Sequence, residues 1–107
     1  MAHESKIEEA ARIIGETAGQ AKVILFGSHA RGNATEDSDV DLLVIEPEVP
    51  DKTAETLRLR KAIRPLRLAN DLLVYSEAEV IERQNSSSSA VFWALRDGKV
   101  LYDTLGG

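Results

Sequence analysis

Apolar residues recur along the chain with two different periods, which predict helices and strands in alternation. The first pattern has the spacing of an amphipathic helix over about residues 4–18. Two short, nearly continuous apolar runs follow at residues 22–26 and 40–45, and such runs are typical of strands covered on both faces. We therefore expect the strand at residues 22–26 to lie in the centre of a sheet.

The alternation continues through the second half of the chain. A helical pattern covers residues 52–68, and Pro65 should end or kink that helix. Residues 71–75 predict a third strand whose side chains alternate between the two faces of the sheet. Two short helices and a last edge strand are expected at residues 77–83, 90–96 and 99–103. Helices between strands predict an α/β fold, in which helices pack on a small mixed β-sheet of about four strands.

Length and composition restrict the kind of protein further. A chain of 107 residues predicts one domain over residues 1–107, with no room for a separate substrate domain, so a partner or a second copy should hold the second substrate. No apolar run approaches the roughly 20 residues that cross a bilayer, and no secretory signal is visible. The absence of cysteine excludes a thiolate metal site and fits a cytoplasmic protein.

Charge is distributed unevenly along the chain. A net charge of −5 argues against broad, sequence-independent binding to nucleic acid, which requires Lys and Arg to neutralise many phosphates. Five cations nevertheless fall in one helical stretch: Arg58, Arg60, Lys61, Arg64 and Arg67. A solvated helix face is the commoner reason for such a run. Docking of an acidic partner and steering of a triphosphate are the alternatives.

Acidic residues surround the start of the second predicted strand. Asp39 and Asp41 stand at i and i+2, so on a strand their carboxylates should point to one face with Cα atoms about 6.6–6.8 Å apart. Both could reach one Mg²⁺, which prefers oxygen ligands and commonly binds one or two carboxylates together with substrate phosphates. The alternative is a polar loop that enters a strand, with one aspartate forming a turn. Asp37 is expected to be a loop acid only.

A turn of small residues follows the first predicted strand. Gly27 leaves room for a phosphate to approach the backbone, and Ser28 can donate its hydroxyl to that phosphate and cap a short helix. Arg31 would share a helix face with Ser28 and could reach a phosphate or pair with an aspartate, two roles that the sequence supports equally. His29 is expected to be solvated rather than a metal ligand.

A third acid, Asp71, opens the otherwise apolar strand at residues 71–75. Its burial without a partner would cost several kcal/mol, so it should have a cation or a hydrogen-bond partner. If this strand lies beside the strand at residues 40–45, three carboxylates converge, which is enough to bridge two metal ions or to let one carboxylate act as a base. The alternative is an acid at a strand end in solvent.

Together these residues resemble a known family. Two motifs look like the signature of the minimal nucleotidyltransferases: Gly-Ser-x-Ala-Arg-Gly at residues 27–32 and Ser-Asp-x-Asp-Leu at residues 38–42. That family belongs to the superfamily of DNA polymerase beta and kanamycin nucleotidyltransferase. Residues 70–74 and 98–103 also look like the family, so the resemblance covers nearly the whole chain and implies the polymerase-beta-like nucleotidyltransferase fold.

The resemblance implies an activity and roles for the residues of the motifs. A nucleoside monophosphate, AMP from ATP, would be transferred to a hydroxyl while pyrophosphate leaves, with two Mg²⁺ ions as cofactor. By that analogy Asp39, Asp41 and Asp71 bind the metal ions, and Asp71 also helps to deprotonate the acceptor. Gly27 and Ser28 would hold the outer phosphates.

The chain resembles in particular the antitoxin of HEPN–MNT toxin–antitoxin pairs, which by family analogy adenylylates a hydroxyl of its HEPN toxin. The main rival is a non-catalytic antitoxin or regulatory subunit of the same fold that neutralises its partner by contact. Transfer to a small molecule such as an aminoglycoside is a second alternative, which would normally need additional helices. No nucleic acid or membrane is expected as a partner, and a homo- or hetero-oligomer is compatible with all three readings.

Overall fold

Ten helices and strands make up the part of the chain that the structure describes. This computed structural model covers residues 2–35 and 38–105. In chain order the elements are α1 (Ala2–Ala18), β1 (Lys22–Phe26), α2 (Ser28–Arg31), β2 (Val40–Glu46), α3 (Lys52–Ile63), the 3₁₀ helix η1 (Arg64–Leu66), β3 (Asn70–Ser76), α4 (Glu77–Arg83), α5 (Ala90–Asp97) and β4 (Lys99–Asp103). The alternation that the apolar pattern predicts is confirmed.

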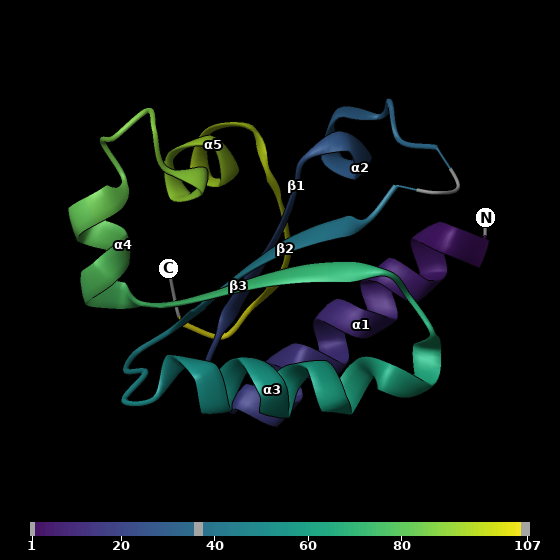
Figure 1. Cartoon of the computed structure of the whole chain (residues 1–107), viewed down its shortest axis with the longest axis horizontal. Helices are drawn as coiled ribbons and strands as arrows, with labels where there is room; N and C mark the ends of the chain where they lie inside the picture. Colours follow the sequence, from purple (N-terminus) through teal and green to yellow (C-terminus); the bar gives the residue numbers. More distant parts are fainter. Residues whose placement is uncertain (1, 36–37, 106–107) are drawn as a thin grey trace.

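The four strands form one mixed sheet in the order β3-β2-β1-β4. Strand β1 pairs antiparallel with both β2 and β4, whereas β2 and β3 run parallel and are joined by a crossover through α3. Figure 1 shows β2 and β3 side by side across the molecule. The predicted central position of β1, the edge position of β4 and the predicted fold class are all confirmed.

Helices cover both faces of the sheet, so both faces of the central strands are buried. Helices α1 and α3 lie below the strands in Figure 1, where Ile14, Val44 and Leu59 are fully buried. Helices α4 and α5 cover the opposite face, where Val80 and Val91 are buried. Each such side chain stabilises the fold by about 1.5–3 kcal/mol. Within residues 2–35 and 38–105, no helix has the length and apolar character needed to cross a membrane.

The stretch around α3 agrees with the prediction for Pro65 and differs from the predicted course in two other respects. As predicted, the α-helix ends before the proline: α3 stops at Ile63, short of residue 68, and Pro65 lies in η1, where the lack of a proline N–H is tolerated because the first turn of a helix has unbonded donors. Arg67 then adopts the left-handed conformation, with φ of 51°. Leu57 belongs to the apolar pattern but is 60% exposed, so it does not join the core.

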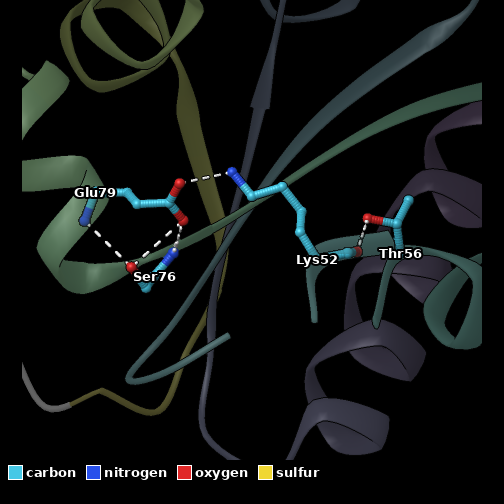
Figure 2. Close-up of polar contacts among 4 residues, drawn as sticks. All are labelled: Lys52, Thr56, Ser76 and Glu79. Carbon is cyan, nitrogen blue, oxygen red and sulfur yellow. Dashed lines mark hydrogen bonds and ion pairs between the residues drawn. The ribbon is translucent and has the colours of Figure 1, made fainter. Parts of the chain in front are cut away.

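A cluster of polar contacts ties α3 to α4 at the end of the sheet where β2 and β3 finish (Figure 2). The Nζ of Lys52 donates to Oε2 of Glu79 at 2.7 Å and lies 4.0 Å from the centroid of the Tyr75 ring. Glu79 also forms a capping box with Ser76: the Ser76 N–H donates to Oε1 at 3.1 Å, and the Glu79 N–H donates to the Ser76 hydroxyl at 3.2 Å. We call this cluster of Lys52, Tyr75, Ser76 and Glu79 the brace.

A buried acid, Glu46, ends β2 at the same end of the sheet. Its side chain is 6% exposed, and its Oε2 has no hydrogen-bond partner among the described residues. Burial, and then the hydrogen bond and charge of Glu55, raise the pKa of Glu46 to about 8. The pKa of Glu55 is lowered, chiefly because the Arg58 guanidinium donates to it at 2.8 and 2.9 Å. At neutral pH Glu46 therefore stays protonated, whereas Glu55 is ionised beside Arg58.

Candidate active site

The ends of three strands meet at the opposite end of the sheet, which we call the site end. Phe26, the last residue of β1, is paired with Asp41 near the start of β2. Asp41 is in turn paired with Asp71 near the start of β3. Neighbouring strands lie about 4.7–4.9 Å apart, and paired residues project their side chains from the same face. Strands β2 and β3 are therefore neighbours, which was the condition for the carboxylates to converge.

Asp41 is the half-buried member of the acidic group, and its surroundings disfavour its negative charge. Burial raises its pKa first, and the charges of Asp71 and then Asp39 raise it further. His29 and Arg31 act in the opposite direction and lower the pKa of Asp41. The carboxylates are thus close enough to repel one another, and two basic side chains of α2 reduce that repulsion.

Asp39 does not occupy the position that its spacing predicts. It is exposed and lies just before β2, which begins at Val40, so Asp39 takes no part in the strand ladder. Among the described residues, no three His, Asp or Glu side chains are already gathered closely enough to hold a metal ion. The structure therefore brings Asp41 and Asp71 together on neighbouring strands and leaves Asp39 beside them at the mouth of the site.

Gly27 is required by the geometry of the turn after β1. Its backbone has φ of 78° and ψ of −155°, a conformation that is essentially restricted to glycine. A Cβ atom at this position would collide with the carboxylate of Asp41. The close approach of the Gly27 backbone to Asp41 therefore depends on glycine for two independent reasons.

Ser28 begins α2, and the predicted cap at Ser28 is wrong. Gly27 is the N-cap residue, and no side chain in the described ranges caps this helix, so the Ser28 hydroxyl is not used for that purpose. Helix α2 has only four residues, which makes its dipole small; the backbone donors of its first turn are the groups that can face an anion. Arg31 is exposed and lines a cavity of about 280 Å³ together with Gly27 and Trp93.

His29 has a structural contact that sequence reasoning missed. It is half-buried rather than solvated, and its Nε2 lies 3.1 Å from the Ser38 carbonyl oxygen, to which an Nε2–H can donate. Ser38 fixes the turn before Asp39, as its hydroxyl accepts from the Thr35 N–H at 3.0 Å. His29 therefore links the glycine turn to the aspartate motif. Asp37 lies outside the described residues.

The carboxylates at the site end fit a hard divalent cation such as Mg²⁺. Asp39, Asp41 and Asp71 offer oxygen ligands only, which Mg²⁺ prefers. The repulsion that raises the pKa of Asp41 is also the interaction that a bound cation would relieve. The absence of a side chain at Gly27 lets the backbone of the turn lie directly against the Asp41 carboxylate, so the turn and the acid belong to one site.

Fold and site together define a class of protein: an α/β domain that presents a glycine turn and several carboxylates at one end of a mixed sheet, where a phosphate ester and its cation can be held. Comparison with protein families identifies that class. The chain belongs to the nucleotidyltransferase domain family, whose model matches residues 7–97. The matched range includes the whole site end, and the resemblance predicted from the two motifs is confirmed.

Two relatives of the chain come from Methanocaldococcus jannaschii, and both carry the name "putative protein adenylyltransferase". One is 42% identical over 53 residues, which are 50% of this chain and 52% of the relative. The other is 49% identical over 41 residues, which are 38% of this chain and 28% of the relative. The chain therefore matches about half, or less, of the length of these relatives.

Two solved structures share the fold. A crystal structure of a toxin–antitoxin with AMP-PNP aligns over 95% of this chain and 74% of its own, with a TM-score of 0.62 and 25% identity. A "putative nucleotidyltransferase" from Sulfolobus solfataricus aligns over 99% of this chain and 90% of its own, with a TM-score of 0.55 and 22% identity. The second likeness concerns the fold alone. Both confirm the predicted nucleotidyltransferase fold.

Proposed function

We propose that this chain transfers AMP from ATP to a hydroxyl of a partner protein, a toxin of the HEPN kind, and so acts as an antitoxin in the cytoplasm. The observation that carries the proposal is the pairing of Asp41 with Asp71 beside the Gly27 turn. Membership of the nucleotidyltransferase domain family supports transfer of a nucleotide. The names of the two archaeal relatives, and the toxin–antitoxin crystallised with AMP-PNP, support an adenylyl group and a toxin as acceptor.

In the proposed reaction Asp39, Asp41 and Asp71 hold two Mg²⁺ ions. When bound, these ions neutralise the triphosphate and stabilise charge on the transferred phosphoryl group. Asp71 accepts the proton of the acceptor hydroxyl. The hydroxyl oxygen forms a bond to the α-phosphorus, and the bond from that phosphorus to the pyrophosphate oxygen breaks.

The turn after β1 holds the leaving part of the nucleotide in this proposal. Backbone N–H groups at Gly27 and Ser28 and the Ser28 hydroxyl donate to the outer phosphates. Arg31 is exposed at the mouth of the same site and is close enough to influence the pKa of Asp41, so it can contact phosphate oxygens as well. Its two predicted roles are therefore compatible, because it faces the carboxylates before the nucleotide binds and the phosphates afterwards.

Transfer of label from ATP radiolabelled at the α-phosphate to a co-expressed partner tests this proposal. Wild-type protein should label the partner, whereas the triple variant Asp39→Asn, Asp41→Asn, Asp71→Asn should not. The same variant separates catalysis from neutralisation by contact, because cells should survive the partner only with the wild-type chain. Survival with the triple variant would show that contact alone neutralises the partner and would reject the catalytic role.

A further inference from the structure

Four of the five cations in the basic stretch line a single groove. Arg58 is used within the fold, since its guanidinium donates to Glu55 and to the Thr17 carbonyl oxygen at 2.9 Å. The other four surround a groove of about 550 Å³ and form no ion pair with any described residue: Arg60, Lys61, Arg64 and Arg67. Unbalanced positive charge is thus concentrated at one place on a chain whose net charge is −5.

The groove adjoins the site end of the sheet. Its wall includes Ala69 and Asn70, and Asp71 is the next residue along the chain. The Ala69 carbonyl oxygen accepts from the Val40 N–H at 2.9 Å, which fixes the wall of the groove to the start of β2. Strand β3 is an edge strand, so a ligand in the groove can pass round that edge toward Asp71 without crossing the sheet.

We infer that this groove docks an acidic segment of the acceptor protein and so directs the acceptor hydroxyl toward Asp71. The inference rests on the proposed function for the identity of the acceptor, but the docking itself depends only on the groove. Carboxylates of the segment pair with the four cations, and Arg in particular binds carboxylates through two parallel hydrogen bonds. Leu57, which is 60% exposed on the rim, offers the apolar contact that is common in protein interfaces.

Other features of the groove favour a peptide over a polynucleotide. Among the described residues, no aromatic side chain lines it on which a base could stack. The net charge of −5 also disfavours a polynucleotide, because a long strand of phosphates would meet the acidic remainder of the chain as well as the groove.

Arg67 is held in the groove at a cost to the backbone. Its φ of 51° and ψ of 45° lie in the left-handed region, where glycine or asparagine is usual after a helix. If the only role of this position were to end η1, glycine would be the expected residue. The presence of an arginine here therefore agrees with a role for its guanidinium in binding.

Fluorescence anisotropy of a labelled twelve-residue peptide of alternating Glu and Asp, at low ionic strength, tests the inference on the full chain. Arg60→Gln/Arg64→Gln should weaken binding about fivefold or more. The matched control is Arg83→Gln/Arg96→Gln, which removes two exposed arginines from α4 and α5 and should bind as wild type does. Equal losses in both variants would reject the groove as the docking site.

Three further measurements complete the test. Arg67→Gly should lower peptide affinity while the melting temperature stays the same or rises; a purely structural role for Arg67 would leave affinity unchanged.

A labelled single-stranded RNA of twelve nucleotides should bind more weakly than the peptide, and tighter binding that the groove variant abolishes would assign the groove to RNA instead. The increase in melting temperature on adding MgATP is measured in parallel: its absence in the wild type would count against the proposed function and leave the peptide result standing.

Discussion

The two ends of the parallel pair β2 and β3 both concentrate carboxylates, but they treat negative charge in opposite ways. At the brace, Glu79 is paired with Lys52, and the nearby Glu46 stays protonated at neutral pH because it is buried beside Glu55. At the site end, Asp41 and Asp71 stand side by side, and neither forms an ion pair with a described residue. The fold pairs or protonates its acids near the brace, whereas at the site end it leaves two neighbouring carboxylates without an ion pair among the described residues, which is where we propose that a cation and phosphates bind.

The largest expected effect comes from removing a charge at the site end. Under the proposed function, Asp41→Asn should reduce adenylyl transfer by roughly 10²–10⁴-fold, because it removes both a proposed metal ligand and the charge beside Asp71. The free energy of unfolding should not fall, since the substitution also removes carboxylate repulsion. Glu82→Gln, an exposed acid of α4, is the control for loss of one negative charge. Transfer of label at the wild-type rate by Asp41→Asn would contradict the assigned site.

Adding one methyl group at the glycine turn should disturb the site end both by strain and by contact. Gly27→Ala is expected to lower the free energy of unfolding by about 2–4 kcal/mol, because the backbone strain and the collision with Asp41 add together. Gly32→Ala is a control for a positive φ alone: the φ of Gly32 is 79°, but its ψ of 12° lies in the left-handed region and no described atom lies within 4 Å of the added Cβ, so the loss should be smaller. Urea denaturation of Gly27→Ala, alone and combined with Asp41→Ala, separates strain from contact, and the same loss in both backgrounds would show that the contact with Asp41 is unimportant.

The buried acid near the brace should make stability depend on pH. Unfolded Glu46 ionises near pH 4.5, whereas the folded chain keeps this proton up to about pH 8. Folding takes up a proton between these pH values, so the free energy of unfolding falls as the pH rises through this window. Glu46→Gln cannot ionise and should gain about 1–3 kcal/mol at pH 8, with little gain at pH 4.5.

Urea denaturation at both pH values measures this difference. The exposed neighbour Glu48 provides the control, because Glu48→Gln changes the same charge without burial. A gain for Glu46→Gln that is the same at both pH values would indicate packing rather than titration as its cause.

The smallest effect should come from the brace itself. Lys52→Met removes the ion pair with Glu79 and the contact with the Tyr75 ring, and we expect a loss of about 0.5–1 kcal/mol because both side chains of the pair are partly exposed. A double-mutant cycle with Glu79→Gln, which retains the capping box, gives the coupling energy of the pair. High salt should reduce that coupling energy. A coupling energy of zero would show that the ion pair between Lys52 and Glu79 does not contribute to the free energy of unfolding.

Local signals were sufficient to predict most elements of the fold. Strand β1 and helix α4 begin and end where the sequence predicts them, because each is bounded by strong signals: glycine on both sides of β1, and Ser76 with Glu79 at the start of α4. The side-chain alternation along β3 also agrees with its pattern, with Leu72 and Leu73 in different cores. These features depend on residues that are close together in the chain.

What the sequence did not predict depends on contacts between distant residues. The convergence of Asp41 with Asp71 was conditional on strand order, which no local pattern contains. The link from His29 to Ser38 and the raised pKa of the buried Glu46 have no signature in spacing. The roles assigned to the site residues by analogy, including that of Asp39 outside the strand, still await the measurements above.

The parallel pairing of β2 with β3 also determines at which stage of synthesis and folding the site can form. Chain synthesis proceeds from the N-terminus at about 5–20 residues per second, so Asp41 leaves the ribosome a few seconds before Asp71, some thirty residues later. During that interval the nascent chain has the glycine turn and two acids but not the strand that completes the sheet. Because α3 must form its crossover before β3 can pair, the site should assemble only as folding is completed. A chain stalled or truncated before β3 is therefore expected to be inert toward nucleotide.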